Sequence, residues 1–331
     1  ILIYLLPDPL RAARSRATQC RAAQCRAAQS SFATLATLSG MPWPEQSPGM
    51  KAERPAERAL FQGLFDDAAV FPPGLVPLTK ALADHVARRW SSWSDLVGPL
   101  LLPPSVIDEL LGLWRAQQLD VVLVGRLGTD LTLLDDALSR MDADASLTPT
   151  GVEIGWSPGW HRALRWGVSL SIEVPRGSEQ EGALTDIAER ADQRHQLRAK
   201  YRTGSTPEQM VPTPTDLATF IRACIDHDLS FKLTGGLHRA ISHTTAEGEE
   251  QFGFLNVIAA TRWAVAHGAE VPEMSSLLSQ RDPVPILDII TRMSQADASV
   301  IRAFFTAYGC CEVEDPVGDL AALGLIKETA V

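Results

Sequence analysis

The sequence predicts a single α/β domain, a closed (β/α)8 barrel over residues 55–331, which follows a disordered tail or linker at residues 1–54. From Leu60 onward, short runs of β-forming residues alternate with stretches of helical period, which is the pattern of βα units around a parallel sheet. Seven or eight such units can be placed, and this number suits a barrel better than an open doubly wound sheet. No glycine-rich dinucleotide loop follows an early strand, so a Rossmann fold has little support.

The expected strands are short apolar or alternating runs bounded by turn residues: Leu64–Phe71, Val97–Leu102, Val121–Gly125, Gly151–Gly155, Val168–Val174, Leu197–Tyr201 and Leu229–Leu233, with an eighth near Ser275–Leu278. Helices are expected at about 75–90, 105–118, 130–141, 158–166, 181–194, 215–227 and 254–267, and two more at 283–294 and 297–308. One helix start is well marked, because Thr213 suits the N-cap, Pro214 the first helical position and Asp216 the first turn.

The first fifty residues differ from the rest in composition. A pentapeptide recurs at 16–20, 21–25 and 26–30, and the segment is rich in arginine and serine and poor in acids. That composition is typical of an organelle transit peptide. A translated upstream region, with Met41 or Met50 as the true initiator, is the alternative interpretation.

Composition limits the class of partner. The net charge is −10, and the acidic balance lies in the residues after the tail, which argues against a nucleic-acid or anionic-membrane partner. No apolar run is long enough to span a membrane, and the five cysteines form no CxxC pair, so we expect reduced thiols and a cytoplasmic location. The expected partner is a small, anionic molecule, and the sequence leaves a homo-oligomer open.

Charged residues alternate with apolar ones on the predicted strands. Glu153, Glu173, Lys200 and Lys232 each lie between apolar neighbours on four consecutive strands. The outer face of a barrel must pack against helices, so these polar positions are expected to point inward, near the carboxyl ends where barrel active sites lie. On the first strand, Asp66 and its neighbour face opposite ways, and one of the two can enter the barrel mouth. A structural network of ion pairs is the alternative role for this ring.

Small and hydroxyl-bearing residues follow the sixth and seventh strands. Backbone N–H groups in such turns can hold a phosphate or carboxylate, although glycines also simply make turns. The candidate anion-binding residues are Arg202, Thr203, Gly204, Thr234, Gly235, Gly236 and Asn256. For Asn256 a helix cap is the plainer role.

Two lysines on adjacent strands indicate carbonyl chemistry. Each ammonium group should disfavour the charge on the other, which lowers one pKa and frees an amine to form an imine. Lys200 is then the nucleophile and Lys232 its tuner, with Glu153 and Glu173 as acid and base and Asp66 and His238 as further candidates. This mechanism needs no cofactor.

Two other classes of function remain open from the residues. Glu153, Glu173, Asp66 and His238 offer oxygen and nitrogen ligands for a divalent metal ion, which would make the protein a metal-assisted lyase or isomerase. No compact metal-binding motif supports this second class. The third class is a non-catalytic barrel that binds an anionic metabolite.

The sixth- and seventh-strand motifs resemble those of the deoxyribose-phosphate aldolase family. Lys200-Tyr-Arg-Thr-Gly and Lys232-Leu-Thr-Gly-Gly carry this resemblance, over about forty residues. The resemblance implies a class I aldolase-like lyase on a (β/α)8 barrel, with Lys200 as the Schiff-base lysine and Lys232 tuning it. The sequence departs where that family has an aspartate on the fourth strand, because Glu153 stands there.

A longer stretch resembles uncharacterised bacterial barrel proteins. The matching segments are Phe65–Pro73, Lys200–Gly204, Phe231–His238 and Gly253–Asn256. Arg239 stands where those proteins have a second histidine, and Phe252 stands where another histidine precedes the glycine. If those histidines are catalytic in the family, the activity of this chain is impaired or altered.

Overall fold

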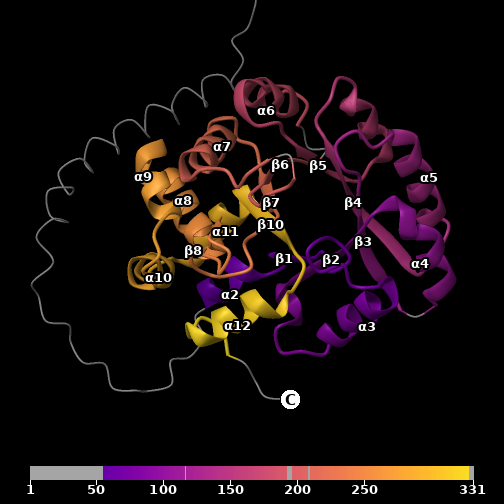
Figure 1. The fold of residues 1–331 in the computed structure, drawn as a ribbon, viewed down its shortest axis with the longest axis horizontal. Helices are drawn as coiled ribbons and strands as arrows, with labels where there is room; N and C mark the ends of the chain where they lie inside the picture. Colours follow the sequence, from indigo (N-terminus) through magenta and orange to yellow (C-terminus); the bar gives the residue numbers. More distant parts are fainter. Residues whose placement is uncertain (1–54, 116, 192–195, 208, 328–331) are drawn as a thin grey trace, which may run out of the picture. The chain divides into compact units, whose positions relative to one another are not determined.

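A computed structural model describes residues 55–115, 117–191, 196–207 and 209–327. Eight parallel strands close into a barrel in the order β1-β10-β7-β6-β5-β4-β3-β2 (Figure 1). The strands are β1 (Phe65–Asp67), β2 (Val97–Leu102), β3 (Leu119–Val124), β4 (Leu147–Gly155), β5 (Ser169–Glu173), β6 (Leu197–Arg202), β7 (Phe231–Thr234) and β10 (Phe305–Cys310). The predicted α/β barrel is therefore confirmed.

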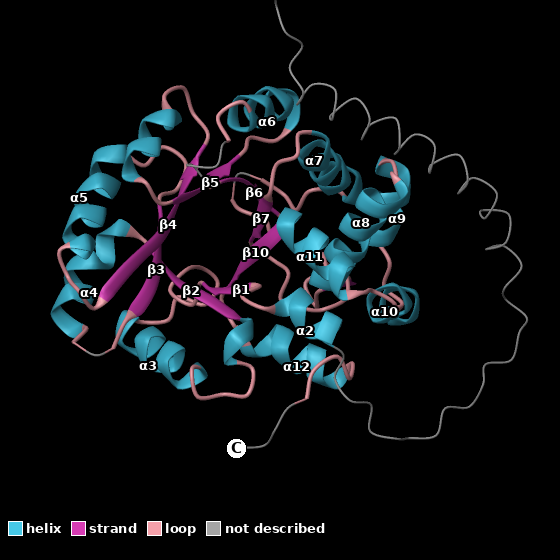
Figure 2. Cartoon of the chain, turned by 180° about the vertical axis from the view of Figure 1, so that it is seen from behind, coloured by secondary structure: helices cyan, strands magenta, loops and turns pink. Residues whose placement is uncertain are grey.

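Helices surround the strands on the outside of the barrel (Figure 2). They are α2 (Pro55–Phe61), α3 (Leu78–Arg88), α4 (Ile107–Leu113), α5 (Leu131–Asp142), α6 (Gln180–Ala188), α7 (Pro214–Asp226), α8 (Phe254–His267), α9 (Val271–Leu278), α10 (Pro283–Thr291), α11 (Gln295–Phe304) and α12 (Glu314–Ala322). Short 3-10 helices lie at Ser94–Leu96, Pro104–Val106, Trp160–Trp166 and Gly177–Glu179, and a two-stranded antiparallel pair joins β8 (His243–Thr244) to β9 (Glu250–Gln251). None of the described helices has the length and apolar character needed to cross a membrane.

The predicted start of α7 is confirmed in atomic detail. The Thr213 side chain accepts a hydrogen bond from the Asp216 backbone N–H, and the Asp216 carboxylate accepts one from the Thr213 backbone N–H. This capping box satisfies N–H groups that the first helical turn leaves without partners. Pro214 occupies the first helical position, as its fixed φ favours.

The eighth strand was predicted in the wrong place. Residues 275–278 belong to α9, and the strand that closes the barrel is β10, which the prediction had assigned in part to a helix at 297–308. The reason is an insertion: α8, α9, α10 and α11 all lie between β7 and β10. In α9 the buried side chains are Met274 and Leu278, four residues apart, which is the spacing of one helical face.

Two further segments are shorter or tighter than predicted. β1 ends at Asp67 because the chain turns there: the Phe71 N–H donates to the Ala68 carbonyl at 2.9 Å. The segment predicted as a helix at 158–166 is a 3-10 helix, bounded by Gly159 and Gly167 in the left-handed conformation.

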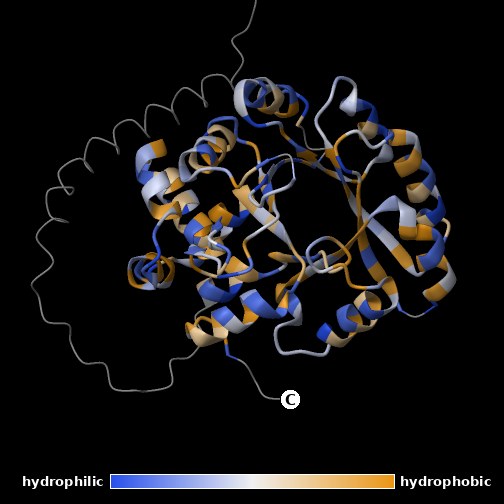
Figure 3. Ribbon diagram, in the orientation of Figure 1, coloured by the Kyte–Doolittle hydropathy of each residue, from blue (hydrophilic) through white to orange (hydrophobic). Residues whose placement is uncertain are grey.

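The apolar core lies mainly between the strands and their helices. On α3 the buried positions are 78, 81, 82, 85 and 88, the spacing of a helix with one face against a sheet. Figure 3 shows this mixture of hydrophobic and hydrophilic residues on the helices around the barrel. A second, small cluster of Leu101, Val122 and Val124 takes the alternate positions of β2 and β3. The barrel interior is therefore apolar toward the carboxyl ends of β2 and β3, whereas Asp120, earlier on β3, lines an inner cavity with Asp66 and Arg198.

Candidate active site

The predicted inward charges meet inside the barrel and form one continuous series of ion pairs. In order, the members of this charge chain are Asp66, Lys232, Glu153, Lys200, Glu173 and Arg202. The Lys200 ammonium lies 2.8 Å from Glu153 Oε2 and 2.9 Å from Glu173 Oε2. Arg202 Nε donates to Glu173 Oε1 at 3.0 Å. Lys232 forms ion pairs with both Asp66 and Glu153, so acidic and basic groups alternate throughout.

Strand register explains one half of this arrangement. Glu173 lies opposite Lys200 on the neighbouring strand, and Lys200 lies opposite Lys232. Paired residues of adjacent strands are about 5 Å apart and share a face, so their side chains are in reach of each other. The other half spans the barrel interior, because Glu153 on β4 and Asp66 on β1 reach Lys232 on β7 across strands that are not its neighbours.

The charge chain runs from the buried interior toward solvent. Lys200, Lys232 and Glu153 are each no more than 2% exposed. The Glu173 and Arg202 side chains, at the carboxyl ends of β5 and β6, are 23% and 30% exposed. The solvent-facing end of the chain is thus at the carboxyl end of the barrel, where barrel enzymes bind their substrates.

The pKa of Glu153 shows how strongly the lysines act on it. Burial alone raises the pKa of this carboxyl, but the two ammonium groups together outweigh burial and lower the pKa to about 2. Glu153 is therefore an anion at any physiological pH. It is a poor proton acceptor and a strong partner for a positive charge.

The predicted lowering of a lysine pKa is wrong. Burial does act to lower the pKa of Lys200 and of Lys232, yet the carboxylates beside each ammonium group outweigh it and raise both values. The cause is the placement of Glu153 between the two lysines, which turns an expected repulsion into two attractions. In the resting state both lysines are ammonium ions.

The pKa of Asp66 shifts in the opposite direction to that of Glu153. Burial raises its pKa, and the single ammonium of Lys232 does not fully offset that effect, so the pKa of Asp66 stays above its ordinary value. Of the two buried carboxyls, Asp66 is therefore the one that gains a proton more easily.

Asp67 points to the opposite face of β1, as the strand alternation predicts for neighbouring residues. Its carboxylate accepts hydrogen bonds from His85 Nδ1 at 2.9 Å and from Arg88 Nη1 at 2.6 Å, both on α3. Arg88 also donates to both oxygens of Glu314, at 2.8 and 3.0 Å. The position of His85 on a helical stretch predicts a surface residue, whereas the structure buries this histidine. Its three-residue spacing from Arg88 on one helix face was the available signal.

The predicted anion-binding turns lie against each other. A Cβ atom on Gly204 would stand 2.9 Å from the Gly235 carbonyl carbon, so glycine is required for this close approach. Gly235 and Gly236 both have left-handed φ values, of 73° and 70°. The Thr203 N–H donates to the Thr234 carbonyl at 2.8 Å, and the Thr203 hydroxyl donates to the Gly235 carbonyl. The two threonines thus hold the turns together.

The same turns leave hydrogen-bond donors available. Within the described part of the chain, the backbone N–H groups of Gly204, Gly235 and Gly236 have no hydrogen-bond partner. Arg202 Nη1 lies 3.6 Å from the position of a Cβ on Gly235. A guanidinium group beside free N–H groups suits the oxygens of a phosphate or carboxylate.

Two predicted site residues lie apart from the charge chain. The His238 ring contacts the Cys311 thiol at 3.7 and 3.8 Å, and burial lowers the pKa of this histidine. Asn256 is fully buried in the first turn of α8. Its Oδ1 accepts from the Ser242 N–H at 2.9 Å, and its Nδ2 donates to the carbonyls of Leu277 and Gln280 at 2.8 and 2.7 Å. Its amide is therefore fully used in joining α8 to the α9 region.

The alternative set of metal ligands is not assembled. Across residues 55–327, apart from the undescribed positions, no three His, Cys, Asp or Glu side chains gather in a group that could hold a metal ion. The carboxylates of Glu153, Glu173 and Asp66 face ammonium or guanidinium groups instead, and His238 faces Cys311.

Comparison of the chain with protein-family models, curated proteins and solved structures found no match.

Proposed function

We propose that the protein is a class I aldolase-like lyase, which acts on a small carbonyl compound through an imine at Lys200. The observation that carries this proposal is the position of Lys200 between a buried carboxylate, Glu153, and a partly exposed one, Glu173. Lys200 can exchange its proton with solvent through Glu173, while the ionised Glu153 remains beside it as a negative charge. The acidic chain also fits a small-molecule substrate better than a nucleic acid or a membrane.

Accessibility favours Lys200 over Lys232 as the nucleophile. Both partners of Lys232, Asp66 and Glu153, are buried, so a carbonyl compound entering from the carboxyl end of the barrel has no direct approach through them. Lys200 adjoins Glu173, which is partly exposed at that end. In this arrangement Lys232 positions Glu153 and keeps it ionised.

The proton steps follow from the two carboxylates. To attack a carbonyl carbon, the Lys200 ammonium must first lose one proton, and Glu173 is the base in contact with both Lys200 and solvent. Burial raises the pKa of Glu173, but Lys200 and Arg202 outweigh burial and lower that pKa, so Glu173 holds the proton only transiently. The amine adds to the carbonyl, and Glu173 returns the proton to the resulting hydroxyl group, which leaves as water and gives a cationic iminium. Glu153, held ionised by its low pKa, faces that new positive charge at the same nitrogen position. The pair thus favours the iminium intermediate.

The acidic group of the substrate would bind beside this lysine. Arg202 contacts Glu173 through Nε and extends its Nη1 toward Gly235, so it links the charge chain to the free N–H groups of Gly204, Gly235 and Gly236. A phosphate or carboxylate held there contacts Arg202, which itself contacts Glu173, the ion-pair partner of Lys200. We therefore propose a small aldehyde or ketone with an anionic end as the substrate class.

One observation favours a second candidate, a non-catalytic barrel that binds an anionic metabolite. Both lysines are fully paired and have raised pKa values, as in a structural ion-pair network. This candidate uses the same anion-binding turns but forms no covalent intermediate. Covalent trapping therefore separates the two candidates.

The test is borohydride reduction of the protein with a panel of small aldehydes and 2-oxo acids, with and without a phosphate group. Intact-mass analysis followed by peptide mapping is expected to find one adduct, at Lys200. Lys80, which is 64% exposed on α3, is the internal control for non-specific reaction. A mass shift that maps only to Lys80, or no shift with any compound while binding persists, would reject the imine and leave the binding protein. A mass shift that maps to Lys232 would reject Lys200 as the nucleophile.

A further inference from the structure

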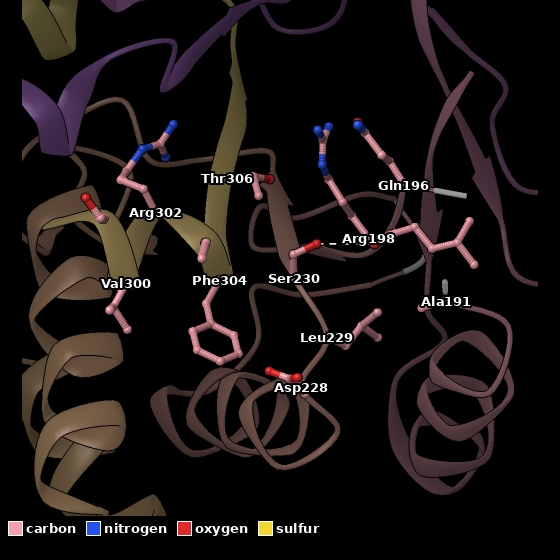
Figure 4. A pocket seen from close by; sticks show the side chains of 13 residues that line it. Ala191, Gln196, Arg198, Asp228, Leu229, Ser230, Val300, Arg302, Phe304 and Thr306 are labelled. Atoms are coloured by element: carbon pink, nitrogen blue, oxygen red, sulfur yellow. Dashed lines mark hydrogen bonds between the residues drawn. The ribbon is translucent and has the colours of Figure 1, made fainter. Parts of the chain in front are cut away.

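A second group of positive charges lies at the amino-terminal end of the barrel. A pocket of about 640 Å³ opens there, between the first residues of β6, β7 and β10 and the end of α11. Arg198 and Arg302 line it, together with Ser230, Thr306 and Asp228. Figure 4 shows the two guanidinium groups on one side of the pocket and Asp228 on the other. We call this pocket the arginine pocket.

Arg198 has no counter-ion of its own. It lies on the inward stripe of β6, two residues before Lys200, and is half-buried. Within the described residues its guanidinium makes no side-chain hydrogen bond and no ion pair, whereas Lys200 makes two ion pairs. A charged group that is partly removed from water without a partner is costly, and such groups are usually paired.

Arg302 is also without a carboxylate partner among the described residues. Its Nη1 and Nη2 donate to the carbonyls of Phe305 and Gln62, at 2.6 and 2.9 Å, which orients the guanidinium without giving it an ion pair. Burial lowers its pKa to about 10, against the opposing effect of the Asp66 carboxylate, and the positive charge of Arg198 adds a smaller lowering. The two arginines are therefore close enough to repel each other, and among the described residues neither forms an ion pair with a carboxylate.

We infer that the arginine pocket is a second anion-binding site, which takes a small oxyanion such as a phosphate or carboxylate group between Arg198 and Arg302. A guanidinium group offers several N–H donors in a fixed plane, and it binds such oxyanions through charge-assisted hydrogen bonds. An anion there would attract both cations and so offset the repulsion between them. The site is at the end of the barrel opposite to the Arg202 turns, and it does not depend on the proposed lyase activity.

The arginine pocket adjoins the buried end of the charge chain. An inner cavity of about 220 Å³ is lined by Arg198 and Thr306, which also line the arginine pocket, and by Asp66 and Lys232. The positive charge of Arg198 acts to lower the pKa of Asp66. An anion bound at Arg198 offsets that charge, so it weakens this effect on Asp66 from the amino-terminal side. The pocket is thus placed to let an anion influence the charge chain without entering the carboxyl end.

The test is isothermal titration calorimetry of the full chain with inorganic phosphate, on wild type, three single variants and one double variant. Arg198→Gln removes the proposed site, and Arg202→Gln removes the guanidinium of the carboxyl-end turns. Arg126→Gln is the matched control, because Arg126 is an exposed arginine in the loop after β3. Circular dichroism and the melting temperature establish that each variant is folded.

The expected result is that Arg202→Gln and Arg126→Gln both retain phosphate binding at the arginine pocket. Adding Arg198→Gln to Arg202→Gln should weaken the remaining binding by about tenfold or more, the usual effect of losing a charge-assisted hydrogen bond. Three outcomes overturn the inference: no phosphate binding by wild type, complete loss of binding in Arg202→Gln alone, or equal binding with and without Arg198.

Discussion

The charge chain and the arginine pocket both include residues from the inward-facing side of β6, yet the charges of these residues are compensated differently. Arg198, Lys200 and Arg202 are alternate residues of β6. At the level of Lys200 the neighbouring residue on β5 is Glu173, and at the level of Arg198 it is Ser171. The lysine therefore has a carboxylate on the adjacent strand, and the arginine two residues earlier has a hydroxyl.

This difference separates charges that the fold satisfies from charges that it leaves to a ligand. Breaking a buried ion pair is strongly destabilising, because the remaining charge stays buried without a partner. Removing a cation that already lacks a partner has no such penalty. Substitutions in the two regions should consequently change the free energy of unfolding by different amounts and in different directions.

The largest expected effect is on the covalent adduct. Lys200→Met should abolish borohydride trapping of a small aldehyde, because the reactive nitrogen is gone, whereas Lys80→Met should leave the trapped fraction unchanged. In wild type the trapped fraction should rise with pH and continue to rise beyond the ordinary lysine pKa, because the raised pKa of Lys200 keeps it an ammonium ion longer. Intact-mass analysis over a pH series measures the trapped fraction in each protein. Trapping that persists in Lys200→Met would contradict the first expectation, and trapping that levels off near neutral pH would contradict the second.

The second effect is on stability. Glu153→Gln leaves two buried ammonium groups without their shared carboxylate, and we expect the free energy of unfolding to fall by about 3–5 kcal/mol. Urea unfolding followed by circular dichroism measures it. Glu173→Gln is the matched comparison and should cost less, because its carboxylate is partly solvated. Equal losses in the two variants would mean that burial does not set the strength of these pairs.

The third effect is the acid dependence of stability. The folded-state pKa of Glu153, about 2, is below its ordinary value of 4.5, so its contribution is complete above about pH 4.5 and is lost as the pH falls toward 2. The full loss is on the order of 3 kcal/mol for one carboxyl. Asp66 acts in the opposite direction, since its raised pKa makes protonation favour the folded state. The loss of stability between pH 4.5 and 2 should thus be smaller in Glu153→Gln and larger in Asp66→Asn than in wild type.

The smallest effect is expected at the arginine pocket. Arg198→Gln removes an unpaired cation beside Arg302, so the free energy of unfolding should stay the same or rise slightly, by less than about 1 kcal/mol. Urea unfolding in phosphate-free buffer is the measurement. A loss as large as that of Glu153→Gln would show that Arg198 is a structural partner and would remove the contrast between the two regions.

Much of the site follows from strand periodicity alone. Because side chains alternate between the two faces of a strand, the sequence is sufficient to place Glu153, Glu173, Lys200 and Lys232 inside the barrel and to set Asp66 and Asp67 on opposite faces. Local chemistry is equally sufficient for the start of α7, where the cap residues contact only their own turn. These features depend on residues a few positions apart, so no knowledge of distant strands is needed.

Tertiary structure alone decided which charge meets which. Barrel closure and stagger set the distances between strands far apart in sequence, and these place Glu153 between the two lysines, which reverses the predicted direction of the lysine pKa shift. The same closure made β10 the eighth strand after four intervening helices. It also left Arg198 opposite a serine. Periodicity fixes the face on which a side chain lies, whereas its partner, and hence its charge state, depends on the register and spacing of strands that only the closed barrel brings together.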